Sequence, residues 1–126
     1  MATTPNFAAT PRFGGASIST ADTSRTSPTN VGTVFTAGSS GSRIDEVTIT
    51  AAGTSTANVV RLFIYTGSTY YLLMEVLITA ITASSSQDSF TTTLTFNSLV
   101  LPSGHSLRAT TNNAETYHVS AFGGDF

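Results

Sequence analysis

Hydrophobic and polar residues alternate with a period of two along most of the chain after residue 30. Residues 43–53 show the pattern clearly, because Val47 and Ile49 fall on one face and Thr48 falls on the other. Residues 89–96 alternate in the same way. A period of two is typical of a β-strand with one face in the core and the other toward solvent. No segment shows the 3.6-residue period of a helix with capping residues at its ends.

Turns rich in Ser, Gly, Pro and Asn separate the alternating segments, which together predict about seven strands. The predicted strands span residues 32–37, 43–53, 58–66, 69–81, 89–96, 105–111 and 116–122, and residues 14–20 are a candidate for an eighth. Regularly spaced short strands are typical of sandwiches and barrels. We therefore expect an all-β protein, an antiparallel β-sandwich with a jelly-roll-like arrangement of seven to eight strands.

Residues 1–30 differ from the rest of the chain. They are rich in Thr, Ser, Ala and Pro, and their hydrophobic residues occur singly, so they bury too little apolar surface to fold alone. One interpretation is a disordered tail. The other is an extended arm on a neighbouring subunit, with a reach on the order of 100 Å, in which Phe7, Arg12 and Phe13 bind the partner. We expect an extended N-terminal arm over residues 1–30 and a β-sandwich domain over residues 31–126.

The two most apolar predicted strands, residues 58–66 and 69–81, carry one charged residue each, Arg61 and Glu75. Counting outward from the turn at residues 66–68 places these two residues close to opposite each other. A buried charge costs several kcal/mol unless it is paired. We expect a salt bridge on one sheet face, and this face is a candidate interface with another subunit.

Tyr65, Tyr70 and Tyr71 cluster at the tip of the same hairpin. Exposed tyrosines suit protein interfaces and sugar stacking. Ordinary packing within the sheet is the alternative. Tyr70 therefore joins Arg61 and Glu75 as an interface candidate.

Charged residues make up 10% of the chain, against about 25% in average globular domains. The chain has five arginines, no lysine and a net charge of −2. Nucleic-acid-binding surfaces need clustered Lys and Arg, whereas these arginines are scattered singly, so we expect no nucleic-acid partner. No stretch approaches the roughly 20 apolar residues of a membrane-spanning helix, so we expect no membrane partner. Ser and Thr make up about a third of the chain, and the β-branched threonines favour strands.

Both histidines lie near the C-terminal end, with Glu115 between His105 and His118. Such side chains form a zinc or iron site only when they converge on one point. His105 follows a Pro-Ser-Gly turn. His118 lies between Tyr117 and Val119, which places it on the solvent side if those two face the core. We expect a terminal hairpin with incidental histidines and no metal ligands.

Other catalytic arrangements are missing from the sequence. The chain has no Gly-x-Ser-x-Gly nucleophile motif and no phosphate-binding glycine loop. Asp45 and Glu46 are adjacent in a predicted strand and point to opposite faces, whereas a glycosidase needs two acids at a set separation. We expect a non-enzymatic protein with no cofactor.

Three stretches of the chain carry a resemblance to a known family. They are TVFTAGSSGSRIDEVTI, VRLFIYTGSTYYLLMEV and LVLPSGHSLRATTNNAETYHVSAFGGDF. Together with the MATTPNFAATPRFG start, they resemble a family of small proteins, of about this length, that tailed bacteriophages and prophages encode. The motifs are specific in combination, and the resemblance covers most of the chain.

The resemblance implies a bacteriophage virion structural protein, and above all a capsid decoration (cement) protein that binds and stabilises the head lattice from the head exterior. The implied partners are the major capsid protein or other virion proteins, and the implied assembly is a homotrimer. An N-terminal arm would strap neighbouring subunits, and many weak contacts add through multivalency. The alternative is a tail, neck or fibre-associated virion protein that binds host surface glycans or other tail proteins.

Overall fold

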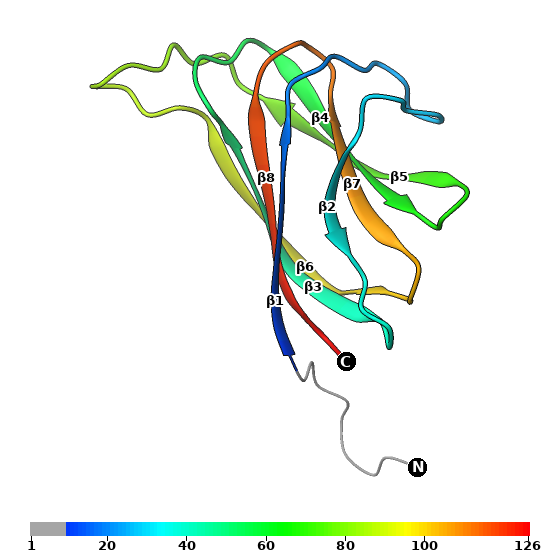
Figure 1. Ribbon diagram of the computed structural model, residues 1–126. Helices are drawn as coiled ribbons and strands as arrows, with labels where there is room; N and C mark the ends of the chain where they lie inside the picture. The colour runs from blue at the N-terminus through cyan, green and yellow to red at the C-terminus, as the bar shows by residue number, and fades with distance from the viewer. Residues whose placement is uncertain (1–9) are drawn as a thin grey trace.

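The computed structural model describes residues 10–126, which form two antiparallel four-stranded sheets (Figure 1). This arrangement is a β-sandwich, so the predicted all-β fold is confirmed. The eight strands are β1 (Thr10–Ile18), β2 (Gly32–Thr36), β3 (Ser42–Ala51), β4 (Asn58–Tyr65), β5 (Tyr70–Ile78), β6 (Thr91–Leu101), β7 (Ser106–Thr111) and β8 (Tyr117–Asp125). Within this part of the chain there is no helix long and apolar enough to cross a membrane.

One sheet, called sheet A, has the strand order β1-β8-β3-β6, and the other, sheet B, has the order β2-β7-β4-β5. The antiparallel partners are nested: β1 pairs with β8, β2 with β7, β3 with β6 and β4 with β5. This is the pairing of one long two-stranded ribbon folded over on itself. It places Thr10 opposite Asp125, so the first and last strands of the sandwich lie side by side.

The core lies between the sheets and follows the predicted alternation. In β3, Val47, Ile49 and Ala51 are buried, whereas Thr48 and Thr50 lie on the outer face. In β8, the inward residues are buried in the same alternating pattern. Strand β4 is buried over most of its length because it lies between β5 and β7. The largest fully buried side chains are Tyr117, Phe35, Phe63, Ile44, Ile49, Leu62, Leu101 and Leu107.

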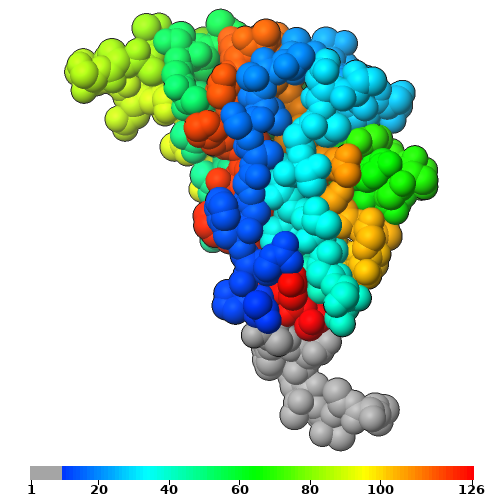
Figure 2. Space-filling view, in the orientation of Figure 1, coloured from blue at the N-terminus to red at the C-terminus, as the bar shows by residue number. Residues whose placement is uncertain are grey.

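The predicted boundary of the N-terminal arm at residue 30 is wrong. Residues 10–18 form strand β1 and pair with β8 along their whole length. Ile18 and Ala16 supply a weak inward alternation, and two glycines interrupt it, which is why the sequence pattern is faint here. One of these glycines, Gly14, allows β1 to lie against β2 (Figure 2), because a Cβ atom at this position would be 2.2 Å from the carbonyl oxygen of Val34.

A second close approach joins β8 to β3. The pairing between these strands shifts register between Ile44 and Glu46. At this irregularity a Cβ atom on Gly123 would lie 1.9 Å from the carbonyl oxygen of Arg43. Only glycine leaves room for the two backbones at this point.

Candidate binding surfaces

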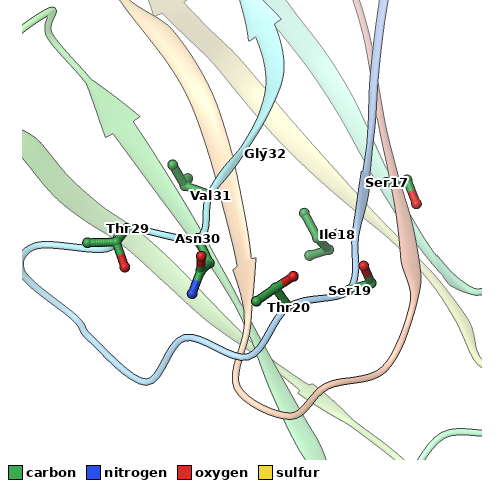
Figure 3. A pocket seen from close by; sticks show the side chains of 8 residues that line it. All are labelled: Ser17, Ile18, Ser19, Thr20, Thr29, Asn30, Val31 and Gly32. Atoms are coloured by element: carbon green, nitrogen blue, oxygen red, sulfur yellow. The ribbon is translucent and has the colours of Figure 1, made fainter.

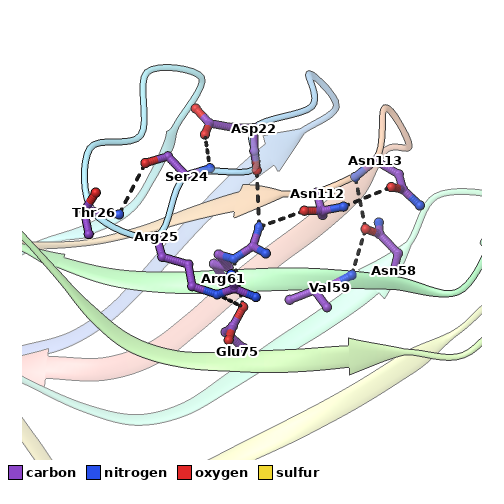
Figure 4. A network of polar contacts seen from close by, with 10 residues as sticks. All are labelled: Asp22, Ser24, Arg25, Thr26, Asn58, Val59, Arg61, Glu75, Asn112 and Asn113. Atoms are coloured by element: carbon purple, nitrogen blue, oxygen red, sulfur yellow. Dashed lines mark hydrogen bonds and ion pairs between the residues drawn. The ribbon is translucent and has the colours of Figure 1, made fainter.

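The segment from Ser19 to Val31, here called the strap, connects β1 to β2 across the outer face of sheet B (Figure 4). The Asp22 carboxylate organises the strap because it accepts hydrogen bonds from the N–H groups of Thr29, Asn30 and Ser24, at 2.7, 2.9 and 3.0 Å. Burial acts to raise the pKa of Asp22, but these backbone hydrogen bonds outweigh it, so the pKa lies below its ordinary value. The strap is therefore a fixed part of the sandwich.

The predicted pairing of Arg61 with Glu75 is confirmed. The Nε atom of Arg61 lies 2.9 Å from a Glu75 carboxylate oxygen, and Arg25 of the strap donates to the same oxygen at 2.9 Å. Arg61 also donates to the backbone carbonyl of Asp22 and to the side chain of Asn112. Partial burial acts to raise the pKa of Glu75, and the two arginines lower it by a greater amount. Arg61 is 3% exposed, so the strap covers this candidate interface residue.

The other candidate on this sheet, Tyr70, makes its contacts within the chain. Its ring packs at 4.3 Å from Tyr65 and edge-on at 5.9 Å from Phe63. Its hydroxyl accepts a hydrogen bond from Arg108, whose guanidinium lies 4.2 Å from the Tyr65 ring centroid. Tyr71 is 60% exposed and is the accessible tyrosine of this hairpin. The contacts of Tyr70 favour the interpretation of packing within the sheet.

The three candidate arm residues differ in their surroundings, and one of them lies outside the described residues. Arg12 joins the ends of three strands: it forms a salt bridge with Asp125 at 2.8 Å, donates to the carbonyl of Thr36 at 3.0 Å and lies over the ring of Phe35. Phe13 is 61% exposed on the outer face of sheet A. Phe7 lies outside the described residues.

The three residues considered as metal ligands have different surroundings. His105 precedes β7 and Glu115 follows it, so the length of that strand separates them. His118 is exposed on the outer face of sheet A, as the burial of its neighbours Tyr117 and Val119 predicted. Among residues 10–126, no group of three His, Cys, Asp or Glu side chains is arranged to hold a metal ion.

Glu115 instead belongs to a polar network at one end of the sandwich. The buried Tyr117 hydroxyl donates to Glu115 at 2.6 Å and accepts from the Asn58 amide at 3.2 Å. Burial and the Glu115 hydrogen bond raise the pKa of Tyr117 to about 12. Burial also acts to raise the pKa of Glu115, but hydrogen bonds from Thr56 and Tyr117 lower it overall. Asn58 continues the network to Thr111 at 2.9 Å. These contacts tie together the loops at this end.

A hollow of about 310 Å³ lies where the end of β1 faces the start of β2 (Figure 3). It has a neutral lining of hydroxyl, amide and small apolar groups. The lining residues are Ser17, Ile18, Ser19, Thr20, Thr29, Asn30, Val31 and Gly32. The Asp22 contacts fix the strap side of this hollow, so its shape is set before any ligand arrives. Its size and lining suit a small neutral polyol or sugar.

The outer face of sheet A carries exposed and half-buried side chains along β1, β3, β6 and β8, whereas the strap makes its contacts with strands of sheet B. We call it the hydroxyl face. Its residues are Phe13, Gly15, Ser17, Glu46, Thr48, Thr50, Thr91, Thr93, Thr95, His118, Ser120 and Phe122. Most have short side chains, which leave the sheet backbone close to solvent.

Two features give the hydroxyl face its chemistry. Threonine hydroxyls meet across β3 and β6, with Thr48 at 3.3 Å from Thr93 and Thr50 at 3.0 Å from Thr91. At the other end of the face, the exposed rings of Phe13 and Phe122 pack with centroids 5.4 Å apart. The alternating threonines in the sequence signalled an outward face, but the sequence could not reveal which of the two sheets stays uncovered.

Comparison with known proteins does not assign this fold and these surfaces to a family, because no protein-family model, no curated protein and no solved structure matches the chain.

Proposed function

We propose that this chain is a structural protein of a bacteriophage virion, a capsid decoration protein that binds the exterior of the head through its hydroxyl face. The sandwich is proposed to be a jelly roll, which the nested pairing of β1 with β8 through β4 with β5 supports. The family resemblance of the sequence motifs supports the virion context. Attachment to a lattice of identical sites makes weak individual contacts sufficient, because they act together.

The observation that carries the proposal is the contrast between the two outer faces. On sheet B the strap covers the region around Arg61, because Arg25 of the strap donates to Glu75 and Arg61 donates to the carbonyl of Asp22. The hydroxyl face of sheet A offers exposed Ser and Thr groups that can both donate and accept hydrogen bonds, directly or through water. Phe13 and Phe122, 61% and 44% exposed, supply an apolar anchor of the kind that dominates interface energetics.

Immunolabelling of particles tests the location. An antibody against this chain would be applied to particles purified from host cells that carry the gene. Label over the heads is the expected result. Particles that lack the chain would refute a virion role, and label confined to tails would favour the second candidate below.

A pair of matched variants tests the surface. The double substitution of Phe13→Ser and Phe122→Ser is expected to reduce retention on heads at least about tenfold. Leu77→Ser is the control, since Leu77 is 79% exposed but lies in β5 of sheet B. Equal retention of both variants would contradict the assignment of the hydroxyl face, whatever the label shows.

A second candidate, a tail, neck or fibre-associated protein that binds host glycans, is favoured by the neutral hollow between β1 and β2 (Figure 3). Binding on a glycan array that Thr20→Val abolishes would support it. Tyr71→Ala is the matched control because this exposed tyrosine lies outside the hollow.

A further inference from the structure

In the two sheets formed by residues 10–126, the edge strands are β1 and β6 in sheet A and β2 and β5 in sheet B. An edge strand presents backbone groups that another chain can pair with, and proteins protect edges with charges, prolines, bulges or short length. β1 carries Pro11 and Arg12 and lies against β2, which is five residues long and bulged. β5 is bulged at Leu73 and carries Glu75, which Arg25 of the strap holds. Three edges are thus protected.

β6 lacks these protections over its regular part. Among the described strands it pairs with β3 alone, and its eleven residues include no charge and no proline. Its own irregularity comes late, between Thr95 and Leu99, where Ser98 has a φ of 66°. The segment from Phe90 to Thr95 is uncharged and rich in β-branched and aromatic residues, and residues 91–95 pair with β3 in an unbroken register.

The backbone groups of this segment point in known directions. The Ala51 N–H donates to the carbonyl of Phe90, so the Phe90 groups face β3. Successive residues of an antiparallel strand alternate, so the N–H and C=O groups of Thr91, Thr93 and Thr95 face away from β3. The short hydroxyl contacts of Thr91 and Thr93 with β3 agree, because side chains lie closest in pairs that share no backbone hydrogen bond. Three consecutive N–H and C=O pairs therefore line the edge.

The sequence around this edge is nearly symmetric, FTTTLTF over residues 90–96. We propose that β6 pairs with β6 of a second copy of this chain, antiparallel and centred on Thr93. This register sets Thr91 opposite Thr95 of the other copy and Phe90 opposite Phe96. Cross-strand threonine pairs and aromatic pairs are both favourable. A twofold contact needs such a self-complementary surface.

The pairing meets no electrostatic obstacle on the hydroxyl face. The acidic side chain nearest the paired residues on this face is Glu46, which lies on β3 opposite Thr95 of β6. In the paired sheet the two Glu46 side chains are about 20 Å apart, from strand spacing and rise, which exceeds the Debye length of about 8 Å at physiological salt.

The contact is weak when isolated. Seven paired residues span about 24 Å and bury on the order of 600 Å² in total, about half the lower limit of a standard interface. We expect a dissociation constant on the order of 0.1–1 mM. Copies gathered at high local concentration would pair. This inference is independent of the proposed virion role, since it concerns the purified chain.

Cross-linking gives a direct test, because the chain has no cysteine of its own. Thr93→Cys, treated with a short bifunctional maleimide at high protein concentration, is expected to give a covalent dimer. His118→Cys is the control. This position is exposed on the same face, but the two introduced cysteines of a paired dimer would be five strand spacings apart, on the order of 24 Å. Equal dimer yields from both variants, or none from Thr93→Cys, would overturn the proposal.

The self-association of the protein without cross-linker, measured by analytical ultracentrifugation, gives a second test. The wild type is expected to show a monomer–dimer equilibrium, and Thr93→Lys, which sets two ammonium groups opposite each other, is expected to raise the dissociation constant at least about tenfold. Ser17→Lys adds the same charge on β1 and should associate like the wild type. A monomer at all concentrations, a trimer, or dimerisation that Thr93→Lys leaves unchanged would each refute pairing through β6.

Discussion

Tyr117→Phe removes one oxygen atom from the polar network that closes one end of the sandwich. The Tyr117 side chain is fully buried, and its hydroxyl donates to the Glu115 carboxylate at 2.6 Å. The Asn58 amide donates to the same hydroxyl and keeps two other acceptors when it is lost, Thr111 and Glu115. The main loss is therefore one hydrogen bond to a charged group, which is worth about 1.5–3 kcal/mol.

The pH dependence of this loss is a sharper test than its size. Burial and the Glu115 hydrogen bond raise the pKa of Tyr117 from 10.0 to about 12 in the folded protein. A group with a raised pKa in the folded state contributes fully below its unfolded pKa, and its contribution falls as pH rises toward the folded pKa. Two pKa units correspond to about 2.7 kcal/mol. The stability gap between wild type and Tyr117→Phe should thus be constant up to pH 9 and nearly close by pH 12.

Urea unfolding followed by circular dichroism measures both quantities. The chain has no lysine, whose ordinary pKa would fall in the same alkaline range as the change expected for Tyr117. The other tyrosines are common to both proteins and cancel in the difference. Tyr71→Phe is the control, since its hydroxyl is on an exposed side chain and its loss should cost less than about 0.5 kcal/mol. A gap below about 0.5 kcal/mol at pH 7, or one that does not change up to pH 12, would refute the network's role.

Three further substitutions test other parts of the structure by urea or thermal unfolding. Asp22→Ala leaves three backbone N–H groups of the strap without their acceptor and should cost about 1–3 kcal/mol at pH 7; because the pKa of Asp22 is lowered, this cost should shrink as pH falls below its ordinary value of 3.8. Gly123→Ala forces a Cβ against the Arg43 carbonyl and should destabilise by on the order of 3 kcal/mol, whereas Gly53→Ala, with open space around it, should change stability by less than about 0.5 kcal/mol. Arg61→Ala should lower the free energy of unfolding by roughly 2–4 kcal/mol, since it leaves a cavity at a buried site and removes the donor to Glu75, the Asp22 carbonyl and Asn112. An unchanged stability would show that the Arg25 contact alone holds Glu75.

The fold was largely predictable because its strands carry the period of two in their side chains. Residues 46–51 and 91–96 alternate strictly, since one face of each strand meets the core and the other meets solvent. Strand β1 was the weak case. Gly14 and Gly15 give no side-chain signal there, although Gly14 is needed for the contact with β2. β2 also broke the pattern, because a bulge turns both Val34 and Phe35 inward.

The surfaces were less predictable than the strands. The Arg61–Glu75 pair followed from counting residues across a hairpin, which is local information. The role of Arg25 did not, because it depends on the strap folding back across sheet B, fifty residues away in sequence from Glu75. Whether an outward face is bare or covered depends on such long-range contacts, and a period-two pattern reads the same in both cases. This is why the hydroxyl face required the structure.

The distribution of charge indicates what kind of contact the hydroxyl face would make in the proposed attachment. Four of the five arginines form ion pairs within the chain, and the fifth, Arg108, lies over tyrosine rings. The ion pairs are Arg12 with Asp125, Arg25 and Arg61 with Glu75, and Arg43 with Asp45, the last without the alignment of a hydrogen bond. The hydroxyl face keeps one acidic side chain, Glu46, among hydroxyls and two phenylalanines. Attraction at long range is therefore small, and a partner must fit by shape and hydrogen bonding. Because salt screens charges and leaves apolar and neutral hydrogen-bonded contacts in place, attachment through this face should survive molar salt, and release by salt alone would indicate a different, charged surface.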